Sequence, residues 1–226
     1  MDFWYETHMH TSEGSGCGRS SAVAQVKAYK QRGYTGIIIT DHFINGYSTC
    51  PKYSKMTWPD KMEYVVAGYE SAKKEGDRTG LDVFLGWEFT VRGSDFLTYG
   101  LGWDFLIDHP DLHRLDVPEY SKLIRDAGGF LAQAHPYRER PYIQHRLPVM
   151  PEYVDAIEVY NASDDNKENG KAMAFAKKHN LPMLAGTDSH STGVYFTSGI
   201  AMKRKAKDIY DIIGAIKDKK VGLILP

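Results

Sequence analysis

The chain has 226 residues and a mass of 25.5 kDa, a length that fits one large domain or two small ones. With 42% hydrophobic and 25% charged residues, its composition is that of an ordinary globular protein and argues against disorder, collagen-like sequence and coiled coil. Lys and Arg number 28 against 29 Asp and Glu, so no overall cationic field exists to hold long nucleic acid or an anionic membrane.

Helix-like and strand-like patterns alternate along the whole chain. Ser21 can cap a helix that Gly33 ends, and the β-branched run 36–40 is apolar on both faces, which is typical of a buried parallel strand. The same patterns predict further helices over 59–74, 118–126, 166–179 and 206–219, and further strands over 81–88, 96–101, 129–135, 156–160, 181–186, 199–202 and 221–225.

Six or seven β/α alternations predict a parallel sheet, either closed into a barrel or open and doubly wound, and we favour the barrel. Because no Pro-, Gly- or Ser-rich linker and no internal repeat interrupts the alternation, we expect a single domain over residues 1–226. The segments 48–59 and 104–118 are expected to be irregular, and loops of that length are often functional.

Two features of the sequence concern its compartment. The chain has two cysteines, too few for a secreted disulfide framework, and its first residues lack the basic and apolar segments of a signal peptide. No apolar run is long enough to span a bilayer. We therefore expect a cytoplasmic protein.

Five of the nine histidines lie just past the carboxyl ends of predicted strands. In barrels and open α/β sheets these ends meet at one mouth, where such folds build their sites. Imidazole and carboxylate are good ligands for divalent metals, and the number of such groups is enough for more than one ion. The metal-ligand candidates at these positions are His8, His10, His42, Glu88, His135, Asp188 and His190.

The pair His8 and His10 has a geometric basis. In an extended segment, residues two apart point the same way, so both imidazoles can contact one ion while Met9 faces the core. An isolated pair of this kind can also be a chance occurrence. The spacing is repeated by Asp188 and His190 at another strand end, which makes chance a poor explanation.

Glu88 and three further residues are assigned individual roles. Glu88 stands between two aromatic residues and would be costly to bury without a cation, so we interpret it as a ligand that bridges two ions rather than a solvated acid. Arg138 could hold phosphate oxygens with its guanidinium, or pair with a surface acid. Asp41 could orient His42, and Cys17 is interpreted as a small structural residue.

Taken in order, five motifs resemble those of the PHP (polymerase and histidinol phosphatase) family of metal-dependent phosphoesterases. They are His8-x-His10-Thr11, Ile39-Thr40-Asp41-His42, Gly86-Trp87-Glu88, Gln133-Ala134-His135-Pro136 and Gly186-Thr187-Asp188-Ser189-His190. The resemblance implies a distorted seven-stranded (β/α) barrel of the TIM type, a cluster of two or three divalent ions, and hydrolysis of phosphate esters. It also implies one ion held by His8, His10, Glu88 and Asp188, and another held by His42 and His190.

At two positions the chain departs from the family pattern. Many members have an additional His or Asp shortly after the first motif, where this chain offers Glu13 as the substitute ligand. Members with three ions also carry a histidine where this chain has none, near Leu97. A third ion would therefore rest on His135 and Glu88, with water or a residue such as Asp95.

These expectations define a metal-dependent hydrolase that uses a metal-bound hydroxide on a small phosphate ester, such as a nucleotide, a sugar phosphate or histidinol phosphate. The expected ions are Zn, Mn or Fe, in preference to Mg. The alternatives are a nuclease or phosphodiesterase that acts on short oligonucleotides, and a non-catalytic metal-binding module. We expect no membrane partner and no long nucleic acid.

Overall fold

The computed structural model describes residues 2–44, 53–141, 143, 147–193 and 197–226. Over these ranges one sheet contains nine strands: β1 (Phe3–Glu6), β2 (Gly36–Ile39), β3 (Asp82–Val91), β4 (Ser94–Tyr99), β5 (Phe130–Gln133), β6 (Ala156–Asn161), β7 (Met183–Gly186), β8 (Gly199–Met202) and β9 (Gly222–Ile224). The helices are α1 (Ala22–Gln31), α2 (Trp58–Thr79), α3 (Trp103–Asp108), α4 (Val117–Asp126), α5 (Asn166–Lys178) and α6 (Ile209–Lys217), with short 3₁₀ turns η1 (Tyr53–Lys55), η2 (Leu112–Arg114) and η3 (Pro151–Tyr153).

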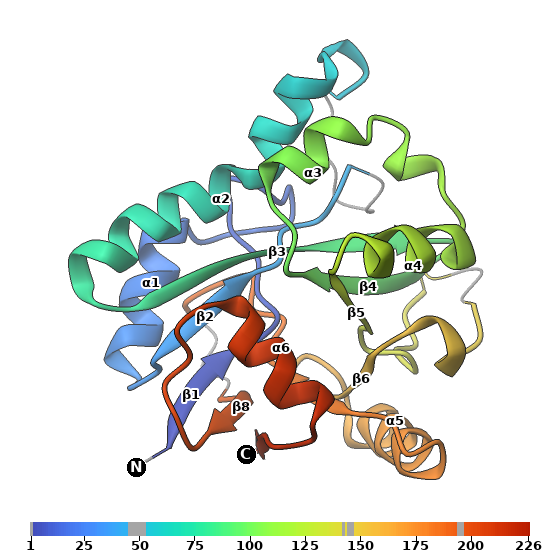
Figure 1. The fold of residues 1–226 in the computed structure, drawn as a ribbon. Coiled ribbons are helices and arrows are strands. Elements are labelled where there is room, and N and C mark those ends of the chain that lie inside the picture. The colour runs from blue at the N-terminus through green and yellow to red at the C-terminus, as the bar shows by residue number, and fades with distance from the viewer. Residues whose placement is uncertain (1, 45–52, 142, 144–146, 194–196) are drawn as a thin grey trace.

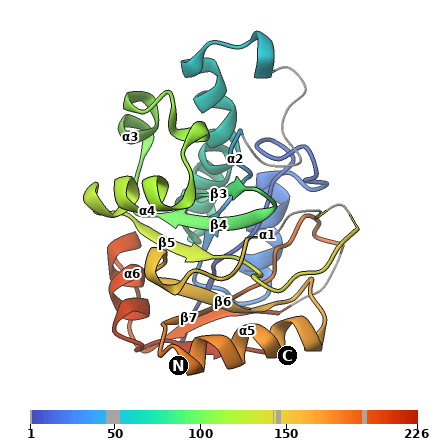
Figure 2. The same cartoon turned by 90° about the vertical axis from the view of Figure 1, so that its right-hand side faces the viewer.

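The sheet has the order β7-β6-β5-β4-β3-β2-β1-β8-β9 and curves round on itself, with helices on its outside (Figures 1 and 2). Strands β1, β2 and β3 pair in parallel, as do β5, β6 and β7. Between these two groups β4 is antiparallel to both of its neighbours. It is joined to β3 by a hairpin turn at Arg92 and Gly93, whose φ values of 47° and 77° match a type I′ turn.

The barrel closes just beyond the ends of β1 and β7. The backbone N–H of Asp188 donates to His8 O at 2.7 Å, and that of His10 donates to Ser189 O at 2.9 Å. These bonds lie beside a parallel bridge between Met9 and Ser189. The first half of β1 pairs instead with the antiparallel strand β8.

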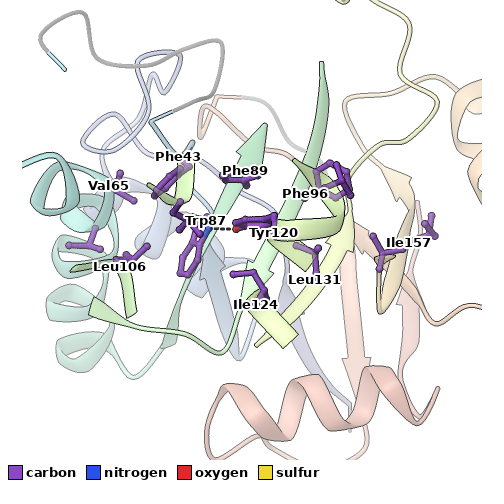
Figure 3. Close-up of a cluster of buried hydrophobic side chains, with 14 of the residues drawn as sticks. Phe43, Val65, Trp87, Phe89, Phe96, Leu106, Tyr120, Ile124, Leu131 and Ile157 are labelled. Atoms are coloured by element: carbon purple, nitrogen blue, oxygen red, sulfur yellow. Dashed lines mark hydrogen bonds between the residues drawn. The ribbon is translucent and has the colours of Figure 1, made fainter. Parts of the chain in front are cut away.

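Alternation along the strands separates the outer core from the barrel interior. Trp87 and Phe89 of β3 lie in a buried cluster with residues of α2, α4 and α5. Within that cluster Trp87 Nε1 donates to Tyr120 Oη at 2.7 Å, and Phe89 stacks on the Tyr120 ring (Figure 3). Because successive strand residues point to opposite faces, Glu88 is directed into the barrel.

The end of the barrel away from the strands' carboxyl termini is closed by α6. Its Ile212, Ile213 and Ile216 pack with inward residues of the strands, and Figure 1 shows the helix in front of the barrel. Tyr210 Oη donates to Gly100 O, directly after the antiparallel strand β4. The opposite end, where the parallel strands end, is left for the candidate site.

The predicted barrel class is confirmed, but three details differ. The sheet has nine strands instead of the seven implied by the family resemblance, because β8 and β9 extend it antiparallel beyond β1. The segment 104–118 is not irregular, since it holds most of α3, all of η2 and the start of α4. Of the segment 48–59, residues 48–52 lie outside the described ranges, and the rest contains η1 and the first turn of α2.

None of the helices in the described ranges combines the length and apolar character needed to cross a lipid bilayer.

Candidate metal centre

Seven side chains converge at the carboxyl end of the barrel. They come from the segments after β1, β2, β5 and β7 and from the interior face of β3. Met9 packs outward into the core with residues of α1 and β2, so its two neighbours point inward, as the spacing predicts. The ligand atoms form overlapping groups in which all atoms lie within 4.8 Å of one another: His8, His10 and Asp188; His8, Glu88 and His135; and His10, His42 and His190.

Glu88 lies at the centre of this arrangement, and its carboxylate is 1% exposed. Its Oε1 lies 3.4 Å from His8 Nε2 and 3.1 Å from His135 Nε2. Its Oε2 lies 3.4 Å from His10 Nε2 and 2.8 Å from His42 Nδ1. Each oxygen therefore faces a different pair of imidazoles, as a carboxylate that bridges two ions would.

The close contacts at Glu88 are not all hydrogen bonds. Although His42 Nδ1 and Glu88 Oε2 are 2.8 Å apart, neither atom has a hydrogen-bond partner of good geometry among the described residues. A buried carboxylate oxygen without such a partner is costly unless a cation compensates it. The donor set, which is imidazole and carboxylate, suits divalent first-row ions.

The cluster perturbs the protonation of its own members. Burial alone would raise the pKa of Glu88, but the adjacent His42 and His8 imidazoles hold it well below its ordinary value. Burial lowers the pKa of His10 well below 6.5, and the neighbouring His190 and His42 lower it further. Glu88 is therefore ionised and His10 neutral near pH 7, which is the state that a metal ligand needs.

Two of these residues have unusual backbone conformations. His135 has φ 26° and Asp188 has φ 53°, in the left-handed region that non-glycine residues rarely adopt. Such strain persists only where surrounding contacts hold it, and it concentrates at functional sites. The contact that holds His135 comes from Glu158, whose Oε2 accepts from the His135 N–H at 2.9 Å.

Glu158 is a functional candidate that sequence reasoning missed. It is fully buried on β6, where its Oε1 accepts from His8 Nδ1 at 3.0 Å and its Oε2 also accepts from Asn161 Nδ2 at 3.0 Å. A carboxylate on the far nitrogen of a ligating imidazole fixes the ring and its tautomer. Gly186 makes room for this contact, because a Cβ there would lie 2.7 Å from His8 Cβ and 2.8 Å from Glu158 Oε1.

Glu6, at the end of β1, was also missed. Its Oε1 accepts from the backbone N–H groups of Thr7, His8 and Thr187, so it ties the segment after β1 to the segment after β7. Burial raises the pKa of Glu6 to about 7, although its hydrogen bonds from His8 and Thr187 oppose the rise.

Arg138, a candidate for binding phosphate oxygens, is paired with acids in the structure. Its Nη2 lies 2.7 Å from Asp188 Oδ2 and donates to Asn161 Oδ1 at 3.0 Å, while its Nε donates to Asp164 Oδ1 at 2.5 Å. The other oxygen of Asp188, Oδ1, faces His10 Nε2 at 3.2 Å. The guanidinium of Arg138 is thus bound to acidic and amide side chains, and it orients the carboxylate of Asp188.

Glu13 and Asp41 are likewise engaged with the backbone and hydroxyl groups. Both oxygens of Glu13 lie 3.0–3.1 Å from the Ala22 N–H at the start of α1, so its carboxylate is outside the cluster. Asp41 does not contact the imidazole of His42. It accepts from Thr11 and from Ser15 Oγ at 2.6 Å, and the same Oγ is 3.1 Å from His10 Nδ1. Asp41 therefore supports His10 through Ser15.

Two further residues lie beside the cluster. Burial raises the pKa of the Cys17 thiol, but hydrogen bonds with His190 and His42 outweigh this effect and lower it to about 6. Asp95, on β4, is buried with its Oδ2 4.0 Å from His135 Nε2 and its Oδ1 accepting from Thr90 Oγ1 at 2.6 Å.

The remaining described histidines lie apart from the cluster. His109 stacks on Phe105, His113 on Trp58 and His179 on Phe175. His145 and the adjacent Arg146 lie outside the described residues.

Comparison with known proteins agrees with this arrangement. A family model described as PHP-associated, PHP_C, matches residues 166–221, and no curated protein matches the sequence. Three solved structures share the fold. One is a two-domain protein from Bacteroides vulgatus that contains a predicted PHP-like metal-dependent phosphoesterase, with a TM-score of 0.75 and 16% identity. The match covers all of this chain but 65% of that one.

The second structure is PsfC from Pseudomonas syringae, with a TM-score of 0.66 and 15% identity over 100% of this chain and 92% of that one. The third, from Bifidobacterium adolescentis, is provisionally described as a metal-dependent phosphoesterase and has a TM-score of 0.57 and 14% identity over 96% of each chain. At these identities the likeness concerns the fold. The family match covers residues 166–221 and, with the shared fold, agrees with the resemblance of the motifs to the PHP family.

Proposed function

We propose that this protein is a metal-dependent hydrolase of small phosphate esters. The observation that carries the proposal is the convergence of His8, His10, His42 and His135 on the buried carboxylate of Glu88, one oxygen of which has no hydrogen-bond partner of good geometry in the described part of the chain. Two of the proteins that share the fold are described as metal-dependent phosphoesterases, which supports the same reaction class.

We assign His8, His10, Glu88 and Asp188 to one ion, and His42 and His190 to a second ion that also contacts Glu88. A third ion would use His135, the Oε1 atom of Glu88 and the carboxylate of Asp95. The carboxylate of Asp95 is buried and lies next to His135. When bound, divalent ions in such a cluster supply Lewis acidity, which activates water and neutralises phosphoryl oxygens.

The contribution of the chain is to hold the ligands in the required state. Glu158 accepts from His8 Nδ1, which leaves the lone pair of Nε2 directed at the cluster. Arg138 binds the outer oxygen of Asp188 and leaves the inner one for an ion. No side chain is required as a nucleophile in this scheme.

A small substrate is favoured over a polymer. The formal net charge of −1 provides no general attraction for a nucleic-acid backbone. Among the described residues, Arg138 and Arg140, which follow His135, are both paired with acids, in particular with Asp164. Substrate phosphate would therefore be held chiefly by the ions, which suits a compact ester.

The test is hydrolysis by the purified protein after chelation and reloading with Mn²⁺, Zn²⁺ or Fe²⁺. The probes are p-nitrophenyl phosphate, bis-p-nitrophenyl phosphate and a single-stranded oligonucleotide. We expect turnover of the monoester, loss of at least about 100-fold in His10→Ala and Asp188→Ala, and little change in the control His179→Ala, which lies at the end of α5.

Other outcomes would change the proposal. Faster cleavage of the oligonucleotide than of the monoester would favour the nuclease alternative. Stoichiometric ion binding without turnover of any ester would favour the non-catalytic module. A protein that binds no divalent ion at all would refute the proposed function.

A further inference from the structure

The second of the proposed ions has an incomplete set of ligands. His42 and His190 supply two imidazoles and Glu88 one shared carboxylate oxygen, whereas a closed tetrahedral site for an ion such as Zn²⁺ has four protein ligands. The sequence offered Glu13 as the additional ligand, but its carboxylate instead accepts from the N–H of Ala22 at the start of α1. A further protein ligand would complete a four-coordinate site.

Cys17 is brought to this position by the fold of its loop. The backbone N–H of Ser15 donates to Thr11 O and that of Gly18 to Ser15 O, so the chain turns back on itself after the second histidine. Two residues beyond the cysteine, the N–H of Arg19 donates to His190 O at 2.8 Å. The loop is thereby fastened to the segment that carries His190.

The thiol of Cys17 lies beside both imidazoles of this pair, His42 and His190. His190 directs its Nδ1 to the carbonyl oxygen of Asp188 at 2.9 Å, which leaves Nε2 for an ion. Its ring and that of His42 both lie against His10, at centroid distances of 4.3 and 4.4 Å. The sulfur therefore lies next to this pair of imidazoles.

A second observation at the same place also points to a cation. The Oε2 atom of Glu88 is buried without a hydrogen-bond partner among the described residues, and it lies 2.8 Å from His42 Nδ1. A purely structural cysteine would be expected among apolar side chains. Cys17 belongs to none of the three apolar core clusters, and two imidazoles lie beside it.

We propose that Cys17 is a metal ligand, which as a thiolate completes the site formed by His42 and His190. The inference rests on the proposed metal dependence and extends it to the choice of ion. On binding, the thiol proton is released to solvent and a sulfur–metal bond forms. A thiolate among imidazoles favours Zn²⁺, Fe²⁺ or Co²⁺ over Mg²⁺ and Mn²⁺ at this position.

Cobalt substitution tests the sulfur–metal bond directly, because thiolate ligation gives Co²⁺ a charge-transfer band in the near ultraviolet. The apoprotein is titrated with Co²⁺ and its bound metal is counted. We expect the band in the wild type and in Cys50→Ser, the matched control at the chain's other cysteine. It should vanish in Cys17→Ser and in Cys17→Asp.

Counting the bound metal separates the loss of the sulfur ligand from misfolding of the variant. Cys17→Asp replaces one anionic ligand by another, so it should retain the wild-type number of ions per chain while losing the band. Cys17→Ala should lose one ion per chain on dialysis. In both variants the far-ultraviolet circular dichroism should match that of the wild type.

The result that overturns this inference is a Co²⁺-loaded wild type without the band, or a band that survives in Cys17→Ser. In either case the ions could still be bound by the histidines, and the proposed function would stand. If the wild type and His10→Ala alike bind no Co²⁺, then the proposed function fails, and this inference fails with it.

Discussion

The carboxylate of Glu158 is predicted to control the tautomer of His8, and Glu158→Gln tests this control. The buried Oε1 accepts from His8 Nδ1, while Oε2 accepts from His135 N and Asn161 Nδ2. A glutamine keeps one oxygen and replaces the other with an NH₂ group. Whichever way it is oriented, one former acceptor position becomes a donor.

The two orientations of the glutamine have different costs. With its NH₂ group on the His135 side, two buried donors face another donor, at about 1–3 kcal/mol for each. With its NH₂ group on the His8 side, every donor is satisfied if His8 Nδ1 becomes an acceptor. The proton then sits on Nε2, and that nitrogen can no longer bind an ion.

The variant should therefore fold almost normally without metal and bind metal poorly. To bind an ion it must adopt the unfavourable orientation, which costs about 2–6 kcal/mol and corresponds to a loss in affinity of about 30-fold to about 10⁴-fold. Competition with a chelator measures the affinity, and urea denaturation of the apoprotein measures the stability. The exposed Glu63→Gln on α2 serves as the matched control.

Wild-type metal affinity in Glu158→Gln would refute this reasoning. So would a loss of affinity that is matched by an equal loss of stability in the apoprotein, because the effect would then be structural. Nitrogen-15 NMR of the histidine rings reports the tautomer of His8 and would identify the cause directly.

Three other predictions concern the framework of the site. The pKa of Glu6 is raised from 4.5 to about 7, so its neutral form favours folding by about 3 kcal/mol. This contribution is lost as the pH rises from 4.5 through 7. The apoprotein of Glu6→Gln should therefore lack this pH dependence of stability, which urea titrations from pH 5 to pH 8.5 would measure. Gly186→Ala should cost about 1–3 kcal/mol and release metal, because its Cβ would lie 2.7 Å from His8 Cβ; unchanged thermal stability and metal content would contradict the close packing. Tyr120→Phe should cost about 1–3 kcal/mol by leaving Trp87 Nε1 without its acceptor while metal affinity stays unchanged, and a variant with altered affinity would show that this cluster is coupled to the site.

The convergence of the proposed ligands could be predicted because it depends on two regular features of the fold. Parallel strands present their carboxyl ends at one mouth, and side chains two apart along an extended segment share a face. His8 and His10 on either side of the buried Met9 follow this rule. Neither feature depends on the exact number of strands, which is why the convergence of the side chains was predictable although the strand count was not.

The supporting acids could not be found by the same reasoning. Glu158 stands between Ile157 and Val159, which pack into the outer core, and such alternation usually indicates that the acid faces solvent. In a closed barrel the opposite face is the interior, so the same pattern describes a buried carboxylate. Local spacing does not distinguish the two cases, because the distinction depends on closure of the sheet.

The ion-pair partners of charged side chains also could not be predicted from the sequence. Arg138 follows His135 closely and was expected to bind substrate, but it pairs with Asp164 and Asp188 from distant segments.

The helix α3 was not predicted because it has six residues and Gly102 at its N-cap forms no side-chain hydrogen bond. A short helix without a cap leaves little signal in the sequence.

Closure of the barrel also affects the order in which the newly made chain can fold and bind metal. The segments that carry His8 and Asp188 are far apart in the chain, yet each donates or accepts a backbone hydrogen bond in the seam that joins them. Contacts between such distant segments form late in folding, because the loop-closure entropy must be overcome first. A growing chain that has not yet reached residue 188 lacks both the seam and two of the seven proposed ligands, Asp188 and His190. Metal capture should therefore mark the completion of folding, and premature binding to the first histidines would have neither Asp188 nor His190 to complete it.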